Sequence, residues 1–303
     1  MSLRALEFYS GIGAFAQAAA NFDIEIAAAF DQSQWANQTY AHNHGLTPSP
    51  RNLDSVKPEY VPAASLWWMS PPCTPFSRRG KQKDEEDHRA RSFLHLIEML
   101  ALKRPEHLCL ENVEGFRQSA VHALLIKKLE SLGYRHLEIR LCASDFGVPM
   151  LRPRLFVVAS RTAQLQAPPP PLKSAPSSLQ EYLFERGQQF DCSPAMLERY
   201  APVLNRVDAD MPGSYLICFT SGYHRCRQAS GSLIETGGGG ARFVSPAEIL
   251  KLLGFGAQYT IPPAVPLEVA YRLVGNSVDV RAIDYLLANV LKLERQSAGG
   301  IGL

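Results

Sequence analysis

The stretch LRALEFYSGIGAFAQAAA, residues 3–20, decides the fold expected for this chain. Residues 3–9 form a short apolar run that is typical of a buried strand, and the glycines within residues 10–13 predict a tight turn. The small residues at 14–20 then favour a helix that packs closely against the strand. A strand, a glycine turn and a helix in this order open a Rossmann-like α/β fold.

The same alternation continues through the first half of the chain. Strands are expected at residues 24–30, 65–70, 107–111, 135–143 and 155–160, and helices at residues 34–43, 92–102 and 121–132. This order predicts an α/β domain with a largely parallel sheet, whose functional loops follow the carboxyl ends of the strands.

The pattern breaks at residues 167–176, where five prolines exclude a regular helix or a central strand. The signal stays irregular up to the four glycines at 237–240, and helical periodicity returns at residues 246–253 and 282–293. We therefore expect a catalytic, cofactor-binding domain made of residues 1–160 and 245–303, with a smaller domain at residues 161–244.

Composition sets limits on the class of protein. The 303 residues carry a net charge of +2, too close to neutral to indicate a nucleic-acid binder by itself. No apolar run is long enough to cross a bilayer, and the first residues do not form a secretory signal. The six cysteines include no CxxC pair, which argues against zinc and against a disulfide framework. These features predict a cytoplasmic protein without a metal or a membrane partner.

Three segments carry residue types suited to catalysis. Cys73 lies in PPCTPFS, where prolines on both sides hold the thiol on a stiff loop, as suits a nucleophile. Glu111 ends a strand, where an acid can protonate a ring nitrogen, and Arg152 and Arg154 can bind a base carbonyl or a phosphate. The alternatives are a structural cysteine, a helix-capping glutamate and a solvated pair of surface arginines.

Two other turns are candidates for cofactor binding. The glycines of FYSGIG allow a ligand to approach the backbone closely, although Ala16 replaces the third glycine of the dinucleotide motif. Asp31 ends the second strand, where an acid typically binds ribose hydroxyls. Asn276 and Ser277 lie in a second polar turn, GNSV, for which a helix cap is the alternative.

Basic residues gather in two places. Residues 78–91 hold six basic and four acidic side chains directly after the Cys73 loop, which predicts either a solvated loop or a lid over the substrate. In the smaller domain, a basic groove for phosphates is expected from His224, Arg225, Arg227 and Arg242.

In chain order, FYSGIG, PPCTPFS, LENVEGF, LRPRLF and GNSV resemble motifs of the cytosine-5 methyltransferase family, across nearly the whole chain. Residues 218–220, 222–223 and 231–233 resemble the branch that methylates transfer RNA, although that branch is named as the second DNA methyltransferase. The resemblance implies a Rossmann-like class I S-adenosylmethionine-dependent methyltransferase, in which the smaller domain recognises the target.

The resemblance also implies the reaction and its residues. In this reaction a methyl group passes from S-adenosylmethionine, leaving S-adenosylhomocysteine, to carbon 5 of a transfer RNA cytosine at anticodon-loop position 38, through a covalent adduct of Cys73. Catalytic roles fall on Cys73, Glu111, Arg152 and Arg154. The cofactor residues are Tyr9, Ser10, Gly11, Ile12, Gly13, Asp31, Gln32, Asn52, Leu53, Pro72, Asn276, Ser277 and Val278. The substrate residues are Arg78, Arg79, Cys218, Phe219, Thr220, Tyr223, Arg225 and Arg227.

Two alternatives stay open at this point. A DNA cytosine-5 methyltransferase would use the same catalytic residues, so DNA is the alternative partner. A catalytically silent nucleic-acid-binding relative is the other, and the presence of Cys73, Glu111 and Arg154 argues against it.

Overall fold

The computed structural model describes residues 2–72, 90–171, 177–226, 228 and 230–296. They form two compact units. The first unit takes its residues from Met1–Leu141, Pro153–Pro170 and Ala282–Leu303, and the second from Cys142–Arg152 and Pro171–Arg281. The target-recognition domain expected at residues 161–244 remains a proposal. Within the described residues, no helix is long and apolar enough to cross a membrane.

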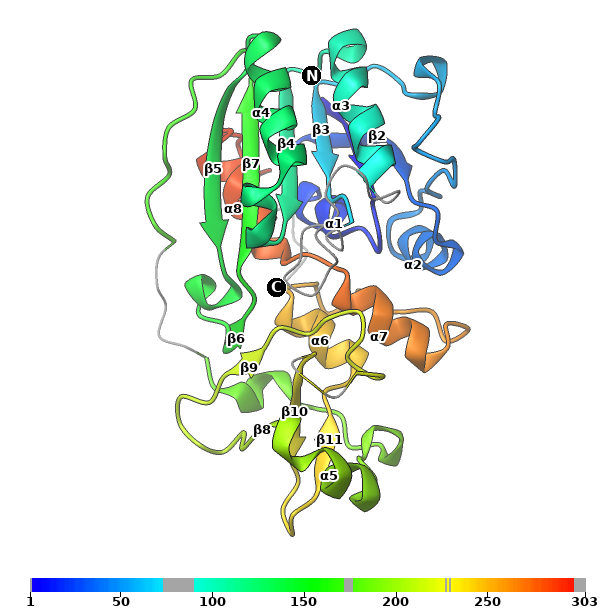
Figure 1. Ribbon diagram of the computed structural model, residues 1–303, viewed down its shortest axis with the longest axis vertical. Coiled ribbons are helices and arrows are strands. Elements are labelled where there is room, and N and C mark those ends of the chain that lie inside the picture. The colour runs from blue at the N-terminus through cyan, green and yellow to red at the C-terminus, as the bar shows by residue number, and fades with distance from the viewer. Residues whose placement is uncertain (1, 73–89, 172–176, 227, 229, 297–303) are drawn as a thin grey trace. The chain divides into compact units, whose positions relative to one another are not determined.

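A six-stranded sheet forms the centre of the first unit (Figure 1). Its strands lie in the order β2 (Ile24–Phe30), β1 (Leu3–Phe8), β3 (Leu66–Met69), β4 (His107–Asn112), β7 (Arg154–Ser160) and β5 (Arg135–Leu141). The first four strands are parallel, as the alternating pattern predicts. However, β7 runs antiparallel to both of its neighbours, so the sheet is mixed.

The direction of β7 determines which residues meet at the edge of the sheet. In the antiparallel register, Glu111 of β4 lies opposite Phe156 of β7, and Asn112 lies opposite Leu155. The beginning of β7 therefore lies beside the end of β4. The carboxyl ends of the parallel strands and the beginning of β7 consequently lie at the same edge of the sheet.

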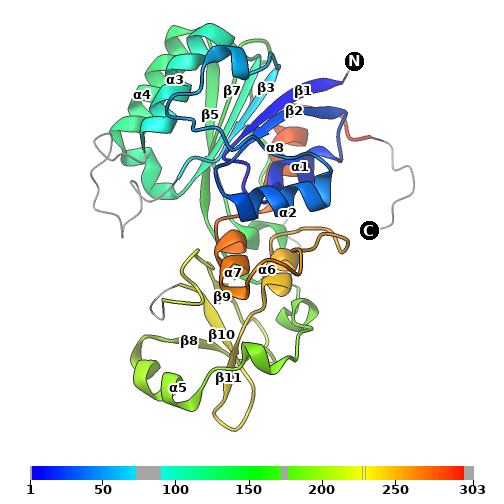
Figure 2. The same ribbon diagram turned by 90° about the vertical axis from the view of Figure 1, so that its right-hand side faces the viewer.

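Helices cover both faces of this sheet. In Figure 2, α3 (Arg91–Lys103) and α4 (Ala120–Ser131) lie on one face, whereas α1 (Ala14–Ala19) and α8 (Val280–Asn289) lie on the other. The helix α2 (Gln34–His44) follows β2. Its first turn is capped by the hydroxyl of Ser33, which accepts a hydrogen bond from the backbone N–H of Ala36 at 3.3 Å.

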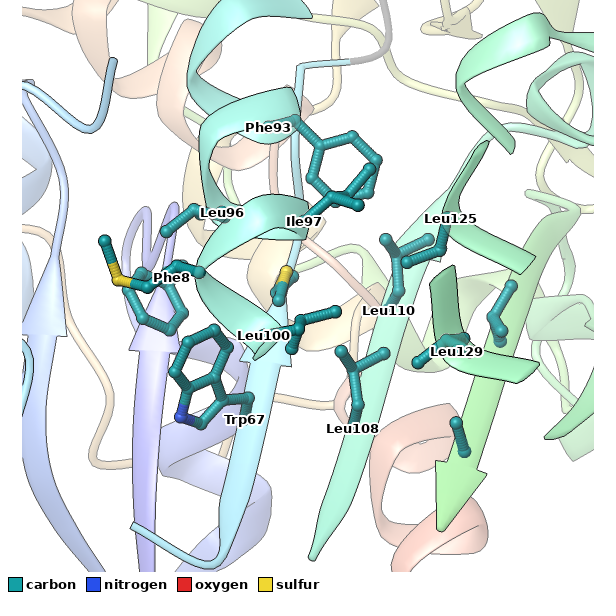
Figure 3. Close-up of a cluster of buried hydrophobic side chains, with 14 of the residues drawn as sticks. Phe8, Trp67, Phe93, Leu96, Ile97, Leu100, Leu108, Leu110, Leu125 and Leu129 are labelled. Atoms are coloured by element: carbon teal, nitrogen blue, oxygen red, sulfur yellow. The ribbon is translucent and has the colours of Figure 1, made fainter. Parts of the chain in front are cut away.

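Apolar side chains spaced at helical intervals bind α3 to the sheet (Figure 3). Phe93, Leu96, Ile97 and Leu100 lie on one face of α3 and are buried in a cluster that includes Trp67 of β3. Each such side chain stabilises the fold by about 1.5–3 kcal/mol relative to an exposed position. This packing fixes the strands that carry the candidate site.

The second unit is built from much shorter elements. β6 (Met150–Leu151) pairs in parallel with β9 (Leu216–Ile217), and β10 (Ser232–Glu235) lies between β8 (Asn205–Val207) and β11 (Ala241–Phe243). Its helices are α5 (Pro194–Tyr200), α6 (Pro246–Leu252) and α7 (Leu267–Gly275). These strands have only two to four residues and the sequence around them has no regular hydrophobic pattern, so the sequence did not predict them.

Single turns of 3₁₀ helix connect many of these elements. They lie at Pro58–Tyr60, Glu114–Gln118, Ala143–Phe146, Leu179–Tyr182, Gln188–Phe190 and Ala201–Val203.

A buried ion pair holds part of the second unit together. Arg242 is only 4% exposed, and its two terminal nitrogens donate to the carboxylate of Glu248 at 2.8 and 2.9 Å. The expectation that Arg242 lines an open basic groove is therefore wrong, because its charge is used internally. Glu248 also accepts from the backbone N–H groups of Phe184 and Glu185, each at 2.8 Å.

The charge of Glu248 is stabilised within the folded protein. Burial by itself raises the pKa of the carboxyl group, but the hydrogen bonds from Arg242 and from the backbone lower it below its ordinary value. A carboxyl whose pKa is lowered on folding adds stability above its unfolded pKa, and that stability is lost as the pH falls through the folded pKa.

Replacing Glu248 tests this pair. Glu248→Gln leaves the buried guanidinium of Arg242 uncompensated, and we expect a loss of about 3–5 kcal/mol in the free energy of unfolding, measured by urea denaturation at pH 7. Glu25→Gln is the control, because Glu25 and Arg4 form an exposed pair at 3.8 Å. Equal midpoints for the two variants would contradict the structural role of Glu248.

Candidate active site

Two of the predicted catalytic residues form an ion pair at the edge of the sheet. Nε of Arg154, at the start of β7, lies 3.0 Å from Oε1 of Glu111, near the end of β4. Their side chains are 16% and 10% exposed, so the pair is shielded from bulk solvent yet still accessible. The antiparallel direction of β7 creates this contact. The carboxyl group of Glu111 and the guanidinium of Arg154 thus lie side by side, where both can contact a polar ring.

The neighbouring residue Asn112 links this edge of the sheet to Pro71, two residues before Cys73. Its Nδ2 donates to the carbonyl of Pro71 at 3.2 Å, and its Oδ1 accepts from the N–H of Val113 at 2.8 Å. Pro71 follows β3, so the point where the chain leaves β3 is fixed beside Glu111. Sequence reasoning did not assign Asn112 a role, although its place in LENVEGF is the signal that could have found it.

Several predicted site residues cannot be placed. Cys73, Arg78, Arg79 and Arg227 lie outside the described residues. Pro72, the last described residue before Cys73, is exposed.

At one position of the glycine turn after β1, the backbone has a conformation that favours glycine. Gly13 has φ +84°, and a Cβ there would lie 2.6 Å from Nε2 of His44 and 2.9 Å from Cδ2 of Tyr40. Both neighbours belong to α2. A side chain at residue 13 would therefore be strained and would also clash with the rings of His44 and Tyr40.

A buried glutamate in β1 holds α2 beside this turn. Glu7 of β1 is 1% exposed, and its Oε2 accepts a hydrogen bond of 2.9 Å from the hydroxyl of Tyr40. Burial raises the pKa of Glu7 to about 8, although the bond from Tyr40 opposes this shift. The contact fixes α2 against β1 next to the turn.

Asp31 is aligned by the same turn. Its Oδ2 accepts from the N–H of Gly11 at 2.9 Å, and its Oδ1 accepts from the N–H of Ser33 at 2.8 Å. Burial raises the pKa of Asp31, while these two backbone bonds oppose the rise. Each carboxylate oxygen can accept more than one hydrogen bond, so the group can also receive the hydroxyls of a sugar.

Ser10 provides an independent sign of a ligand at this turn. Its hydroxyl is buried and has no hydrogen-bond partner among the described residues. A buried, unsatisfied hydroxyl is costly, and a polar ligand atom would satisfy it. The residues at the turn therefore fit a ligand with several polar groups, such as a nucleoside.

The other predicted cofactor residues of the first unit have varied surroundings. Tyr9 donates its hydroxyl to Oγ of Ser92 at 3.0 Å, and Gln32 is exposed. Asn52 accepts the N–H of Asp54 at 2.9 Å. The side chains of Ile12 and Leu53 are buried.

In the second unit, residues 218–220 combine accessible and buried side chains. Cys218 and Thr220 are half-buried, whereas Phe219 is buried. Tyr223 is buried too; its hydroxyl donates to the carbonyl of Ser232 and accepts from the N–H of Val244. The rings of Phe219 and Tyr223 pack edge-on against each other, with their centroids 4.8 Å apart. Arg225 is exposed and remains a candidate for phosphate contact.

The GNSV turn follows α7 directly. The hydroxyl of Ser277 is buried without a hydrogen-bond partner among the described residues, as is that of Ser10 in the first unit. Asn276 is exposed and Val278 is buried. A buried hydroxyl without a partner in the described part of the chain is the feature that makes Ser10 a candidate ligand contact, so Ser277 is a candidate as well.

The side chain of Arg152 contacts the main chain of two segments, residues 218–220 and the GNSV turn. It is 3% exposed, and its Nη1 donates to the carbonyl of Phe219 at 2.7 Å. Its Nη2 donates to the carbonyls of Gly275, at 3.2 Å, and Ser277. Arg152 and Arg154, both of which were expected to be catalytic, thus have different surroundings: Arg152 binds backbone carbonyls and Arg154 binds Glu111. Within the described residues, no cluster of His, Cys, Asp and Glu could hold a metal.

The chain is similar to known methyltransferases along almost its whole length. Residues 3–292 match the family model described as C-5 cytosine-specific DNA methylase. The tRNA (cytosine(38)-C(5))-methyltransferase of Spodoptera frugiperda is 31% identical, with 95% of this chain and 98% of the relative covered. The corresponding protein of Schizosaccharomyces pombe is 28% identical, with 96% and 97% covered.

Solved structures agree with these sequence matches. The crystal structure of S. pombe Dnmt2 methyltransferase superposes with a TM-score of 0.84 at 28% identity, covering 94% of this chain and 97% of that one. A mutant of S. frugiperda DNMT2 superposes with a TM-score of 0.81 at 30% identity, covering 94% and 98%. The chain has the class I S-adenosylmethionine-dependent methyltransferase fold and belongs to the C-5 cytosine-specific DNA methylase family.

Proposed function

We propose that this chain methylates carbon 5 of cytosine 38 in the anticodon loop of a transfer RNA. The observation that carries the chemistry is the Glu111–Arg154 pair, which Asn112 ties to the start of the Cys73 loop. The substrate is inferred from relatives that are named tRNA (cytosine(38)-C(5))-methyltransferase.

The proposed reaction uses Cys73 to activate the base. Carbon 5 of cytosine is a poor nucleophile. Addition of the Cys73 thiolate to carbon 6 moves an electron pair toward nitrogen 3, where Glu111 supplies a proton or a hydrogen bond. Carbon 5 then behaves like an enamine carbon and accepts the methyl group. Loss of the carbon 5 proton to a base re-forms the double bond and expels the thiolate.

Glu111 and Arg154 are suited to hold the base during these steps. The guanidinium fixes the orientation of the Glu111 carboxyl group, and arginine forms the geometrically specific contacts that a base carbonyl requires. By the family resemblance, Arg154 contacts the oxygen at position 2. The base is therefore oriented by two groups that the sheet positions rigidly.

S-adenosylmethionine supplies the methyl group when it is bound. In this proposal Asp31 accepts the ribose hydroxyls and the hydroxyl of Ser10 bonds a polar atom of the cofactor; the orientation of Asp31 by Gly11 and the Ser10 hydroxyl, unpartnered within the described residues, support these roles. Ser277 is the corresponding group of the GNSV turn.

An RNA loop is the substrate that a compact enzyme captures at the lowest cost. The target base must leave its stack to reach the thiol, and a loop cytosine is already partly unstacked. The exposed Arg225 is suited to a phosphate contact. A Dictyostelium discoideum relative, 27% identical, is named DNA (cytosine-5)-methyltransferase, so duplex DNA is the competing substrate.

A direct assay distinguishes the two substrates. Total transfer RNA and duplex DNA are each incubated with the enzyme and cofactor and then sequenced after bisulfite treatment. We expect protection of a single anticodon-loop cytosine by the wild type and none by Cys73→Ala. Cys226→Ala, which removes an exposed thiol, is the control and should retain activity. Efficient methylation of DNA with unmodified anticodon loops would assign the activity to DNA instead.

Glu111→Gln tests the proton donor. The amide keeps the shape of the side chain but cannot act as an acid, so kcat should fall by about 10²–10⁴ while the affinity for S-adenosylhomocysteine stays the same. Glu114→Gln serves as the matched control, because Glu114 forms an exposed pair with Arg140. A kcat within twofold of wild type for Glu111→Gln would exclude Glu111 from catalysis.

Asp31→Asn tests the cofactor contact. Loss of a charge-assisted hydrogen bond costs about 1.5–3 kcal/mol, so the Kd for S-adenosylmethionine should rise at least roughly tenfold in calorimetry. Asp23→Asn changes an exposed carboxyl group just before β2 and should leave the Kd unaltered. An unchanged Kd for Asp31→Asn would mean that other residues hold the ribose.

A further inference from the structure

The guanidinium of Arg152 connects two segments of the second unit that are far apart in sequence. Through Nη1 it contacts the carbonyl of Phe219 at 2.7 Å and Sγ of Cys218 at 3.1 Å. Through Nη2 it contacts the carbonyls of Gly275 and Ser277. One side of the planar group therefore holds residues 218–219, and the other side holds the start of the GNSV turn.

A second observation, independent of Arg152, shows how closely these segments pack. A Cβ added at Gly275 would lie 2.4 Å from both the carbonyl carbon and the carbonyl oxygen of Thr220. Real Cβ atoms do not approach backbone so closely, and backbone cannot move aside as a flexible side chain can. The absence of a side chain at residue 275 thus permits direct contact between the end of α7 and residues 218–220.

The chemistry of this position favours arginine over other residues. The carbonyls of Gly275 and Ser277 lie at the carboxyl end of α7, where the helix dipole attracts a cation. A guanidinium presents several N–H donors in a fixed plane and can bridge acceptors on two sides. The ammonium of lysine is a compact point charge on a flexible stem and cannot reproduce that bridge.

We propose that Arg152 is a positioning residue that clamps residues 218–220 to residues 275–278, so that the two segments move as one element. The consequence for function rests on the proposed function together with the family resemblance, which implies that the segment 218–220 contacts the RNA and residues 276–278 contact the cofactor. Loosening of the clamp would then disturb both binding events through a single side chain.

Hydrogen exchange of the unliganded protein tests the clamp without any ligand. The amides of Leu216 and Thr220 donate to the carbonyls of Pro149 and Ser230, and those of Asn276 and Ser277 donate to carbonyls of α7. In Arg152→Lys, we expect exchange to accelerate at least tenfold in both segments. Wild-type exchange in either segment would overturn the proposal.

Arg242, another buried arginine among the described residues of the second unit, supplies the matched control. Arg242 is 4% exposed and binds Glu248 and the carbonyl of Phe243 rather than the clamped segments. Arg242→Lys should lower the Tm by an amount similar to Arg152→Lys while leaving exchange at residues 216–220 and 275–278 at the wild-type rate. Equal acceleration in both variants would show general destabilisation and would refute a clamp.

A variant on the other side of the contact guards against misfolding of Arg152→Lys. Gly275→Ala keeps Arg152 but forces the end of α7 away from Thr220. We expect the same two segments to exchange faster, with wild-type exchange elsewhere in the second unit. Unchanged exchange in a folded Gly275→Ala protein would overturn the close contact on which the clamp depends.

Binding measurements then test the link to function. The Kd for S-adenosylhomocysteine and the KM for transfer RNA should both rise about tenfold in Arg152→Lys and Gly275→Ala, and stay within twofold in Arg242→Lys. Faster exchange with unchanged Kd and KM would refute the functional coupling. If the wild type methylates neither RNA nor DNA, the proposed function fails, whereas the exchange data still decide whether Arg152 is a clamp.

Discussion

The antiparallel direction of β7 is the constraint on which the candidate active site depends. If β7 ran parallel to β4, Arg154 would lie beside His107 at the start of β4, four residues or roughly 13 Å from Glu111 at about 3.3 Å per residue. In the observed register, Nε of Arg154 is 3.0 Å from Glu111. Strand direction, rather than any loop, brings the acid and the guanidinium together beside the start of the Cys73 loop.

Buried arginines have a different task in the second unit. Its strands contain only two to four residues, so sheet ladders contribute few hydrogen bonds there. Arg242 and Arg152 supply contacts that the short elements lack, the first through Glu248 and the second through backbone carbonyls. The charges of Arg152 and Arg242 are thereby used inside the unit, whereas Arg225 is exposed.

The cofactor turn shows how a weak sequence signal gains physical meaning. Gly13 permits the close approach of α2, Glu7 and Tyr40 fix that helix against β1, and Asp31 is oriented by the N–H of Gly11. The buried hydroxyl of Ser10 then remains for a ligand. A G-x-G pattern by itself carries little information, whereas these contacts support the proposed cofactor site.

The sequence by itself determined the α/β alternation from residue 3 to residue 160, because apolar strand runs there alternate with helices whose hydrophobic period is readable. Its ordered motifs also led to the family that the comparisons confirm. Only the tertiary structure decided the direction of β7, the short strands of the second unit and the partners of Arg152 and Arg242. Those features depend on contacts between distant residues, such as Arg152 and Ser277, which are 125 positions apart. A local pattern predicts what an element is, but the partner of a long buried side chain is set by the packing of the whole unit.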